Sequence, residues 1–273
     1  TGAFKVRNGL NAVLALDEEQ RRRGVVAAST GNHGQGLAWA GLKVGAPVTI
    51  CVPEGNNPDK NAAIRAMGAT LVESGRDYVA AVEAAEALRR ERGLTLVHST
   101  ENRDVLAGAA TIGLEILEER PDVHVIIAAL GGGSQAVGAI AASRGLGAET
   151  RVIAAQALGA SAGHDSWHAK QRLTTERAAT FAEGVATRTT YDLTFDALVS
   201  GLSDFVTVSD AEIGNGMRLA LSATHTLVEP AGAVGLAALR RLAPSLEGRT
   251  VAIIFSGANV DGATLTRVIN REI

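Results

Sequence analysis

Lys5 is a candidate nucleophile, because it stands between the apolar residues Phe4 and Val6 in the segment T-G-A-F-K-V-R. A lysine that is desolvated by apolar neighbours has a lowered pKa, and its free amine can form a Schiff base with a carbonyl group. We expect a helix to begin close by, near Arg7. The alternative is a surface lysine whose apolar stem is covered while its ammonium group reaches water. The residues alone leave both interpretations open.

Two turns in which a strand runs directly into a helix could each bind an anion. One is S-T-G-N-H-G-Q at positions 29–35, and the other is G-G-G-S at positions 131–134. Free backbone N–H groups and the helix dipole favour an anion at a helix N-terminus, and successive glycines let the backbone wrap around it. The alternatives are that Ser29 or Thr30 merely caps the first helix and that the glycines form a tight turn. Neither turn has the spacing G-x-G-x-x-G or the ending Gly-Lys-Ser/Thr, which disfavours a nicotinamide enzyme or an NTPase.

A third candidate site follows the last apolar run, where S-G-A-N places Ser256 and Asn259. Ligands gather at the carboxyl ends of parallel strands, although Ser256 could also be a turn residue that bonds its own backbone. Two other kinds of chemistry lack their motifs. Ala136 stands where a serine nucleophile at Ser134 would need glycine, and the six histidines include no H-E-x-x-H helix.

The elements that must position these residues alternate between short apolar strands and longer helices. This rhythm indicates crossover connections and parallel sheets, and strands that are apolar throughout should be covered by helices on both faces. We expect Leu158 to Thr194 to form loops and short helices, with His164 to His168 as a candidate lid and Trp167 packed on the sheet. The expected strands lie in GVVAAS, PVTICVP, TLVES, TLVHS, VHVIIAAL, TRVIAAQ, FVTVS and TVAIIFSG.

Composition excludes several classes of protein. The 273 residues are 46% hydrophobic, enough for one large core or two smaller domains. The net charge is -3, from 26 basic and 29 acidic residues, and no basic stripe suggests a nucleic-acid partner. Cys51 is the only cysteine, which excludes an internal disulfide and fits the cytoplasm. No apolar run reaches the roughly 18 residues that span a membrane, so we expect no membrane partner.

Four motifs, taken in their order along the chain, resemble those of the fold type II enzymes that depend on pyridoxal phosphate (PLP). They are F-K-V-R, S-T-G-N-H-G-Q, G-G-G-S and S-G-A-N. The closest resemblance is to the serine/threonine dehydratases and serine racemases. It continues through V-P-E-G-N-N-P-D-K, T-F-A-E-G-V-A-T-R and V-E-P-A-G-A, and so covers nearly the whole chain. The resemblance implies an α/β fold similar to the tryptophan synthase β chain. It has two parallel sheets with helices on both faces, a large PLP-binding domain at 1–24 and 99–273, and a small mobile domain at 25–98.

The resemblance also implies a role for each motif. Lys5 would bind PLP covalently and later remove the α-proton of an amino-acid substrate. The residues implied to bind the cofactor are Phe4, Lys5, Asn32, Gly131, Gly132, Gly133, Ser134 and Ser256, and those implied to bind the substrate carboxylate are Ser29, Thr30, Asn32 and His33. The implied reaction is the elimination of water and ammonia from a β-hydroxy amino acid such as L-threonine or L-serine, giving a 2-keto acid.

Several departures from the family pattern refine these expectations. Thr30 is a candidate second catalytic residue, but it stands where the racemases use a serine, and its stiffer side chain favours elimination over racemisation. Metal-dependent members carry acidic ligands where this chain has Gln156, Ala160 and Ala162, so we predict no divalent-metal site. Ser134 and Ala258 replace common glycines, and binding should survive both changes.

The ends of the chain also bear on the expected activity. Family members carry a segment before the lysine motif, so Lys5 could be poorly held here. No regulatory domain follows the last strand, so we expect no feedback control. A homodimer is expected from the resemblance. Three alternatives stay open: β-replacement as in cysteine synthases, racemisation on the same fold, and a catalytically silent binding protein.

Overall fold

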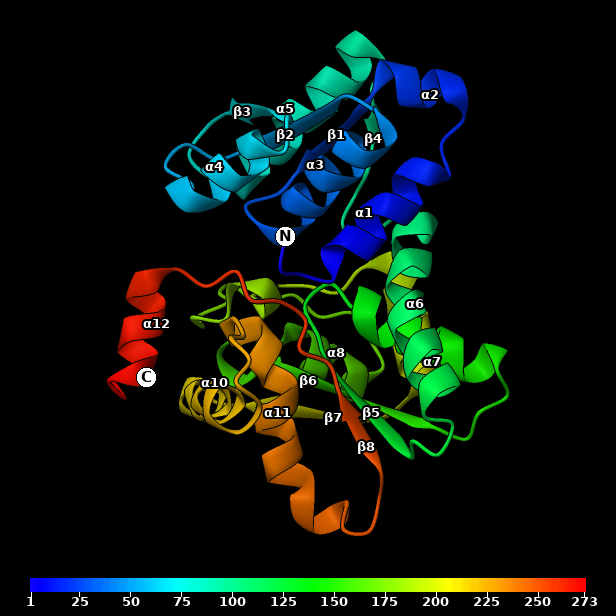
Figure 1. The fold of residues 1–273 in the computed structure, drawn as a ribbon, viewed down its shortest axis with the longest axis vertical. Helices are drawn as coiled ribbons and strands as arrows, with labels where there is room; N and C mark the ends of the chain where they lie inside the picture. Colours follow the sequence, from blue (N-terminus) through cyan, green and yellow to red (C-terminus); the bar gives the residue numbers. More distant parts are fainter. The chain divides into compact units, whose positions relative to one another are not determined.

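The computed structural model describes all of residues 1–273 and divides the chain into two compact units (Figure 1). Unit 1 consists of Thr1 and Ala3–Gly108, and unit 2 consists of Gly2 and Ala109–Ile273. Each unit contains one four-stranded sheet in which every strand pair is parallel. None of the helices is both long and apolar enough to span a bilayer. The domain boundaries implied by the family resemblance stay a prediction.

Unit 1 is built on a sheet with the strand order β3-β2-β1-β4. Its strands are β1 (Val25–Ala28), β2 (Val48–Val52), β3 (Thr70–Glu73) and β4 (Thr95–Leu96). Its helices are α1 (Lys5–Leu14), α2 (Glu18–Arg23), α3 (Asn32–Val44), α4 (Pro58–Ala66), α5 (Tyr78–Arg92) and the first residues of α6 (Arg103–Glu119).

Helices cover both faces of this sheet, as the apolar strands predict. Val25 and Ala27 of β1 belong to a buried cluster with Leu37 of α3. The intervening Val26 belongs to a second cluster with Ala81 of α5. Because successive strand residues point to opposite faces, the two clusters lie on opposite sides of the sheet.

Helices α1 and α3 approach so closely that only glycine fits at their crossing. A Cβ atom on Gly9 would lie 2.6 Å from the carbonyl oxygen of Gly36, and one on Gly36 would overlap the carbonyl oxygen of Lys5. The first turn of α1 therefore packs directly on α3. Helix α1 begins at Lys5 and not near Arg7, so the sequence-based start was wrong by half a turn and Lys5 is itself helical.

Unit 2 is built on a sheet with the strand order β7-β6-β5-β8. Its strands are β5 (Val125–Ala129), β6 (Arg151–Ala157), β7 (Leu202–Val208) and β8 (Val251–Ile253). Its complete helices are α7 (Ser134–Gly145), α8 (Ala162–Ala169), α9 (Asp192–Gly201), α10 (Asp210–Thr224), α11 (Pro230–Leu242) and α12 (Gly262–Ile269).

The strands of unit 2 also alternate between two buried clusters. Ile127 of β5 packs with Val234 of α11 and Ile213 of α10, whereas Ile126 packs with Ala136 of α7 and Leu198 of α9. Helices therefore cover both faces, which confirms the expected fold class. In Figure 1, α11 crosses one side of this sheet while α7 lies on the other.

The stretch from 158 to 194 is made of loops and short helices, as expected, with α8 its main regular element. Trp167 packs on the cluster around Phe205, and its ring Nε1 donates to the carbonyl oxygen of Leu198 at 3.1 Å. This geometry confirms the packing interpretation of Trp167.

Candidate active site

Lys5 of unit 1 is the first residue of α1, and its ammonium group lies 4.8 Å from the centre of the Phe4 ring. Burial lowers the pKa of Lys5 to about 8. A much larger fraction of its amine is therefore unprotonated near neutral pH than in an exposed lysine. This favours the desolvated interpretation of Lys5 over a surface lysine.

The turn between β1 and α3 holds the residues expected to bind the substrate carboxylate. The Ser29 hydroxyl oxygen accepts from the amides of Gly31 at 3.3 Å and Gly34 at 2.9 Å, so Ser29 does cap the first turn of α3. Thr30 is exposed, and its carbonyl oxygen accepts from the side-chain amide of Asn56 at 3.3 Å. Asn56 thus anchors the turn. The roles of Ser29 and Thr30 toward a substrate stay predictions.

His33 follows Asn32 in the first turn of α3 and is buried as a neutral ring. Its Nε2 donates to the carbonyl oxygen of Val97 at 2.9 Å, so Nδ1 carries a lone pair. This Nδ1 is buried and has no hydrogen-bond partner. Burial first, and then the positive charge of Lys5, lower the pKa of His33 to about 3. A buried acceptor without a partner is costly unless a ligand satisfies it.

His98 is a second imidazole near Lys5, and the sequence motifs do not reveal it. It lies just beyond β4, and its Nδ1 accepts from the backbone amides of Thr100 at 3.1 Å and Glu101 at 2.8 Å. Burial lowers the pKa of His98, Lys5 lowers it further, and Glu101 opposes the shift. The only sequence signal for His98 is its place at the carboxyl end of an expected strand.

In unit 2, the glycine turn follows β5, and its shape requires glycine at two positions. Gly133 has a φ of 98°, a backbone conformation that side chains rarely adopt. A Cβ atom on Gly131 would lie 2.5 Å from the carbonyl oxygen of Gly184. This turn leads into the N-terminus of α7, a position that suits an anion.

Two threonine hydroxyl groups donate hydrogen bonds to carbonyl oxygens of this turn. Thr187 Oγ1 donates to the carbonyl oxygen of Gly131 at 3.4 Å, and Thr194 Oγ1 donates to that of Gly132 at 3.1 Å. The carbonyl oxygen of Gly133 accepts from the amide of Val137 at 2.9 Å. Thr187 lies in the segment T-F-A-E-G-V-A-T-R, but nothing in that segment links it to the glycines, and Thr194 lies outside the quoted motifs. The two threonines are 56 and 62 positions from the glycines that they contact.

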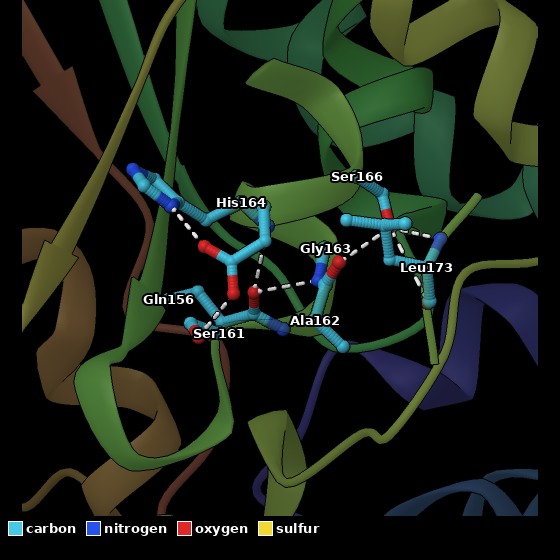
Figure 2. Close-up of polar contacts among 8 residues, drawn as sticks. Gln156, Ser161, Ala162, Gly163, His164, Ser166 and Leu173 are labelled. Atoms are coloured by element: carbon cyan, nitrogen blue, oxygen red, sulfur yellow. Dashed lines mark hydrogen bonds and ion pairs between the residues drawn. The ribbon is translucent and has the colours of Figure 1, made fainter. Parts of the chain in front are cut away.

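Gln156, at the end of β6, occupies a position where metal-dependent relatives were expected to carry an acidic ligand. Its Oε1 accepts from the backbone amides of Gly163 and His164, each at 3.1 Å, at the start of α8 (Figure 2). Its Nε2 donates to Thr187 Oγ1 at 3.3 Å. Gln156 is fully buried, and both ends of its amide bind protein groups.

The other polar groups around α8 bond to one another. Ser161 donates to one oxygen of Asp165 at 2.7 Å, and His164 Nδ1 lies 2.9 Å from the other oxygen. No group of three or more His, Cys, Asp and Glu side chains in the chain is arranged to hold a metal ion. The absence of a divalent-metal site in the protein stays a prediction.

Ser256 follows β8, which pairs directly with β5, so Ser256 and the glycine turn leave the same edge of the sheet. Ser256 is buried. The next residue is held in place, because the carbonyl oxygen of Gly257 accepts from the amide of Glu229 at 2.9 Å. This is the edge at which parallel sheets bind ligands.

These residues fit the chemical demands of PLP. Its aldehyde needs an amine of lowered pKa, and Lys5 supplies one. Its phosphate needs a set of backbone amides that point toward it. The turn at Gly131–Ser134 is so closely packed that a Cβ atom on Gly131 would collide with the carbonyl oxygen of Gly184. Each unit also has buried polar side-chain atoms without a hydrogen-bond partner, on His33 in unit 1 and on Gln135 in unit 2, and such atoms favour a polar ligand. Lys5 belongs to unit 1, and the glycine turn and Ser256 belong to unit 2.

Comparison with known proteins agrees with this chemistry. Residues 1–257 match the family described as pyridoxal-phosphate dependent enzyme. An L-threonine ammonia-lyase of Thermotoga maritima is 37% identical over 274 residues, covering 100% of this chain and 68% of the relative. An L-threo-3-hydroxyaspartate ammonia-lyase of a Pseudomonas species is 36% identical over 261 residues, covering 96% of this chain and 82% of the relative.

The fold also matches solved structures. Maize serine racemase superposes with a TM-score of 0.92 at 30% sequence identity, covering 99% of this chain and 84% of the racemase. The chain therefore belongs to the pyridoxal-phosphate-dependent enzymes, in the fold type II family of serine/threonine dehydratases.

Proposed function

We propose that this protein is a PLP-dependent ammonia-lyase that eliminates water and then ammonia from a β-hydroxy amino acid, giving a 2-keto acid. The observation that carries the proposal is Lys5, a lysine whose pKa burial lowers to about 8, in a chain that also carries a glycine cradle for a phosphate. When bound, PLP supplies an electron sink that spreads the negative charge left at the substrate α-carbon. The protein's residues bind and orient the cofactor and the substrate, and they transfer the proton.

We assign the proton transfer to Lys5. Lys5 would hold the cofactor covalently through Nζ, and the same atom would accept the α-proton of the substrate. The lowered pKa keeps much of this amine unprotonated near neutral pH, as a general base requires. His33 and His98 support this state, because both rings are neutral and neither competes for the proton.

The remaining roles follow the motifs. The cofactor phosphate would be held by the backbone amides and the serine hydroxyl of Gly131, Gly132, Gly133 and Ser134. Asn32 would hold the ring hydroxyl, Ser256 would hold the ring nitrogen, and Phe4 would pack beside the ring. The substrate carboxylate binds at the N-terminus of α3, where the proposed ligands are Ser29, Thr30, Asn32 and His33.

We propose L-threonine and L-serine as the first substrates to test, with L-threo-3-hydroxyaspartate next. Relatives named for threonine and for hydroxyaspartate are 37% and 36% identical to this chain. Elimination is preferred over racemisation because Thr30 is stiffer than the serine that acts as the second acid/base in the racemases.

The test begins with an absorbance spectrum of the protein with PLP, before and after borohydride. Borohydride should fix PLP to Lys5, as identified by peptide mass spectrometry. Addition of L-threonine or L-serine should then release a 2-keto acid and ammonia in equal amounts. Cysteine formation that depends on sulfide would instead indicate β-replacement, and an inverted α-carbon without keto acid would indicate racemisation. Failure to bind PLP would contradict the proposal as a whole.

We further propose that the protein acts as a homodimer in the cytoplasm. The family resemblance supports the dimer, and the single cysteine, buried in unit 1, is consistent with a reducing compartment. Light scattering on the eluting peak of a size-exclusion column measures the mass in solution. A mass near that of one 28.1 kDa chain would contradict the dimer.

A further inference from the structure

We infer that Thr187 and Thr194 are positioning residues that aim the backbone amides of Gly132 and Gly133 at the cofactor phosphate; the inference rests on the proposed function. Both threonines donate to carbonyl oxygens of the glycine turn, at 3.4 Å for Thr187 to Gly131 and at 3.1 Å for Thr194 to Gly132.

Because the peptide bond is planar, a hydrogen bond to its carbonyl oxygen also fixes the direction of its N–H group. In a trans peptide unit the C=O of one residue and the N–H of the next point in opposite directions. Holding the carbonyl of Gly131 toward Thr187 therefore aims the N–H of Gly132 away from that threonine. Holding the carbonyl of Gly132 toward Thr194 does the same for the N–H of Gly133. Two successive amides thus face the side of the turn opposite the threonines.

The glycines of the turn need these hydrogen bonds to fix the direction of their amides. A glycine peptide unit can rotate into either orientation at little steric cost, so the turn by itself does not select the direction of its amides. Neither the Gly132 amide nor the Gly133 amide has a hydrogen-bond partner within the chain. The threonine hydroxyls therefore select the orientation that leaves both donors available to an anion.

Gln156 fixes the hydroxyl of Thr187. Its Oε1 accepts from the amides of Gly163 and His164, which sets the orientation of its side-chain amide and presents Nε2 as a donor to Thr187 Oγ1. A hydroxyl has one hydrogen. Since Nε2 donates to the Thr187 oxygen, the hydrogen of that hydroxyl is left for the carbonyl of Gly131. Thr194 Oγ1 has two carbonyl acceptors in reach, Gly132 at 3.1 Å and Tyr191 at 3.3 Å, and the shorter contact is the one to the glycine turn. Its side chain is fully buried.

The test compares the affinities of purified variants for PLP and for pyridoxal, which lacks the phosphate. Thr194→Val and Thr187→Val keep the side-chain shape but remove the hydroxyl. Each should weaken PLP binding roughly tenfold, the equivalent of one misdirected hydrogen bond, with little change for pyridoxal. Gln156→Glu keeps the acceptor oxygens at α8 but loses the donor to Thr187, and should weaken PLP binding like Thr187→Val. Thr194→Ser should restore the affinity for PLP.

Thr150→Val is the matched control. The Thr150 hydroxyl is also buried and donates to a backbone carbonyl, that of Val123 at 2.7 Å, but it lies at the opposite edge of the sheet, before β6. This variant should lower the melting temperature without changing the ratio of PLP to pyridoxal affinity.

Three outcomes would overturn the inference. The first is an equal loss of PLP and pyridoxal affinity in Thr194→Val and Thr187→Val, which would mean a general structural effect. The second is an unchanged PLP affinity in both folded variants. The third is a shift of the ratio in Thr150→Val as large as theirs. If the wild-type protein bound no PLP at all, the proposed function would fail first and this inference with it.

Discussion

At the scale of single residues, burial decides the charge states in unit 1. Lys5, His33 and His98 are all pushed toward their neutral forms, chiefly by desolvation. An uncharged amine is reactive toward a carbonyl, and an uncharged imidazole can accept a hydrogen bond without repelling a nearby cation. The sequence position of Lys5 suggests its reactivity, but the charge states of the two histidines depend on what covers them.

The first prediction concerns the titration of Lys5. Because an amine reacts only when unprotonated, modification of Lys5 by trinitrobenzenesulfonate should rise with pH around the lowered pKa of about 8, and not around the ordinary lysine pKa of 10.5. Mass spectrometry of the Lys5 peptide, in protein free of PLP, measures the midpoint. Exposed Lys170 in the same sample serves as the internal control. A common midpoint for both lysines would contradict the prediction.

Replacement of Lys5 itself gives a second prediction. Lys5→Arg keeps the positive charge but cannot form the covalent link or take the α-proton at neutral pH. Release of 2-keto acid from L-threonine should fall at least about 10³-fold, because the residue serves as both nucleophile and base. Borohydride should no longer fix PLP to the protein. Retention of more than a tenth of the activity would show that another residue carries out the proton transfer.

The third prediction links His33 to the pH dependence of stability. Its pKa is about 3 in the folded chain against an ordinary value of 6.5, so between these values the unfolded chain binds a proton that the folded chain does not. Stability is therefore fully present above pH 6.5. It should fall by about 1.4 kcal/mol per pH unit as the pH drops below 6.5.

Urea unfolding at pH 5, 6 and 7 measures this slope, with His33→Gln as the comparison. The glutamine amide can still donate to Val97 but does not titrate, so the slope should become shallower by about 1 kcal/mol per pH unit. Part of the slope should remain, because the pKa of His98 is also lowered. Equal slopes in the two proteins would show that His33 is not the group responsible.

At the scale of elements, the crossing of α1 and α3 determines where Lys5 lies. Gly36 belongs to α3, the helix that begins within the motif at 29–35, and a Cβ atom there would overlap the carbonyl oxygen of Lys5. The close approach therefore fixes the first turn of α1 against α3. The two candidate motifs of unit 1 come together through this contact, and a side chain at the crossing would push them apart.

The fourth prediction is that Gly36→Ala destabilises the protein by about 1–3 kcal/mol, because backbone atoms must move to admit the methyl group. It should also raise the pH midpoint of Lys5 labelling, as the displaced lysine becomes better solvated. Gly145→Ala is the control, since this helical glycine has open space around its Cβ position and alanine is the better helix former. Equal stabilities of the two variants would contradict the steric argument.

At the scale of the whole molecule, each unit has its own sheet and its own buried clusters. Ile50 is fully buried in unit 1 and Ile127 is fully buried in unit 2. Each unit can therefore lose stability through its own core.

The fifth prediction follows from these separate cores. Ile50→Ala should cost about 2–5 kcal/mol, and the loss of hydrogen-exchange protection should be larger in β1 and β2 than in β5 and β6. Ile127→Ala should show the reverse pattern. Hydrogen exchange followed by mass spectrometry resolves the two sheets. A uniform loss across both sheets in either variant would show that the units unfold as one.

The local pattern of the chain was sufficient to predict most of the regular structure, including the two strand-to-helix turns that are proposed to bind anions. Alternation of short apolar runs with helical segments predicted the eight strands, because strand and helix periodicities are properties of neighbouring residues. The motifs at Lys5, at 29–35 and at 131–134 predicted the family, which the comparisons confirm.

Only the tertiary structure decided which distant groups form hydrogen bonds with the residues of these motifs. His33 bonds to a residue 64 positions away, and Thr187 and Thr194 reach the glycine turn across 56 and 62 positions. Such pairings depend on how the crossover connections bring strand ends together, and no local pattern encodes them.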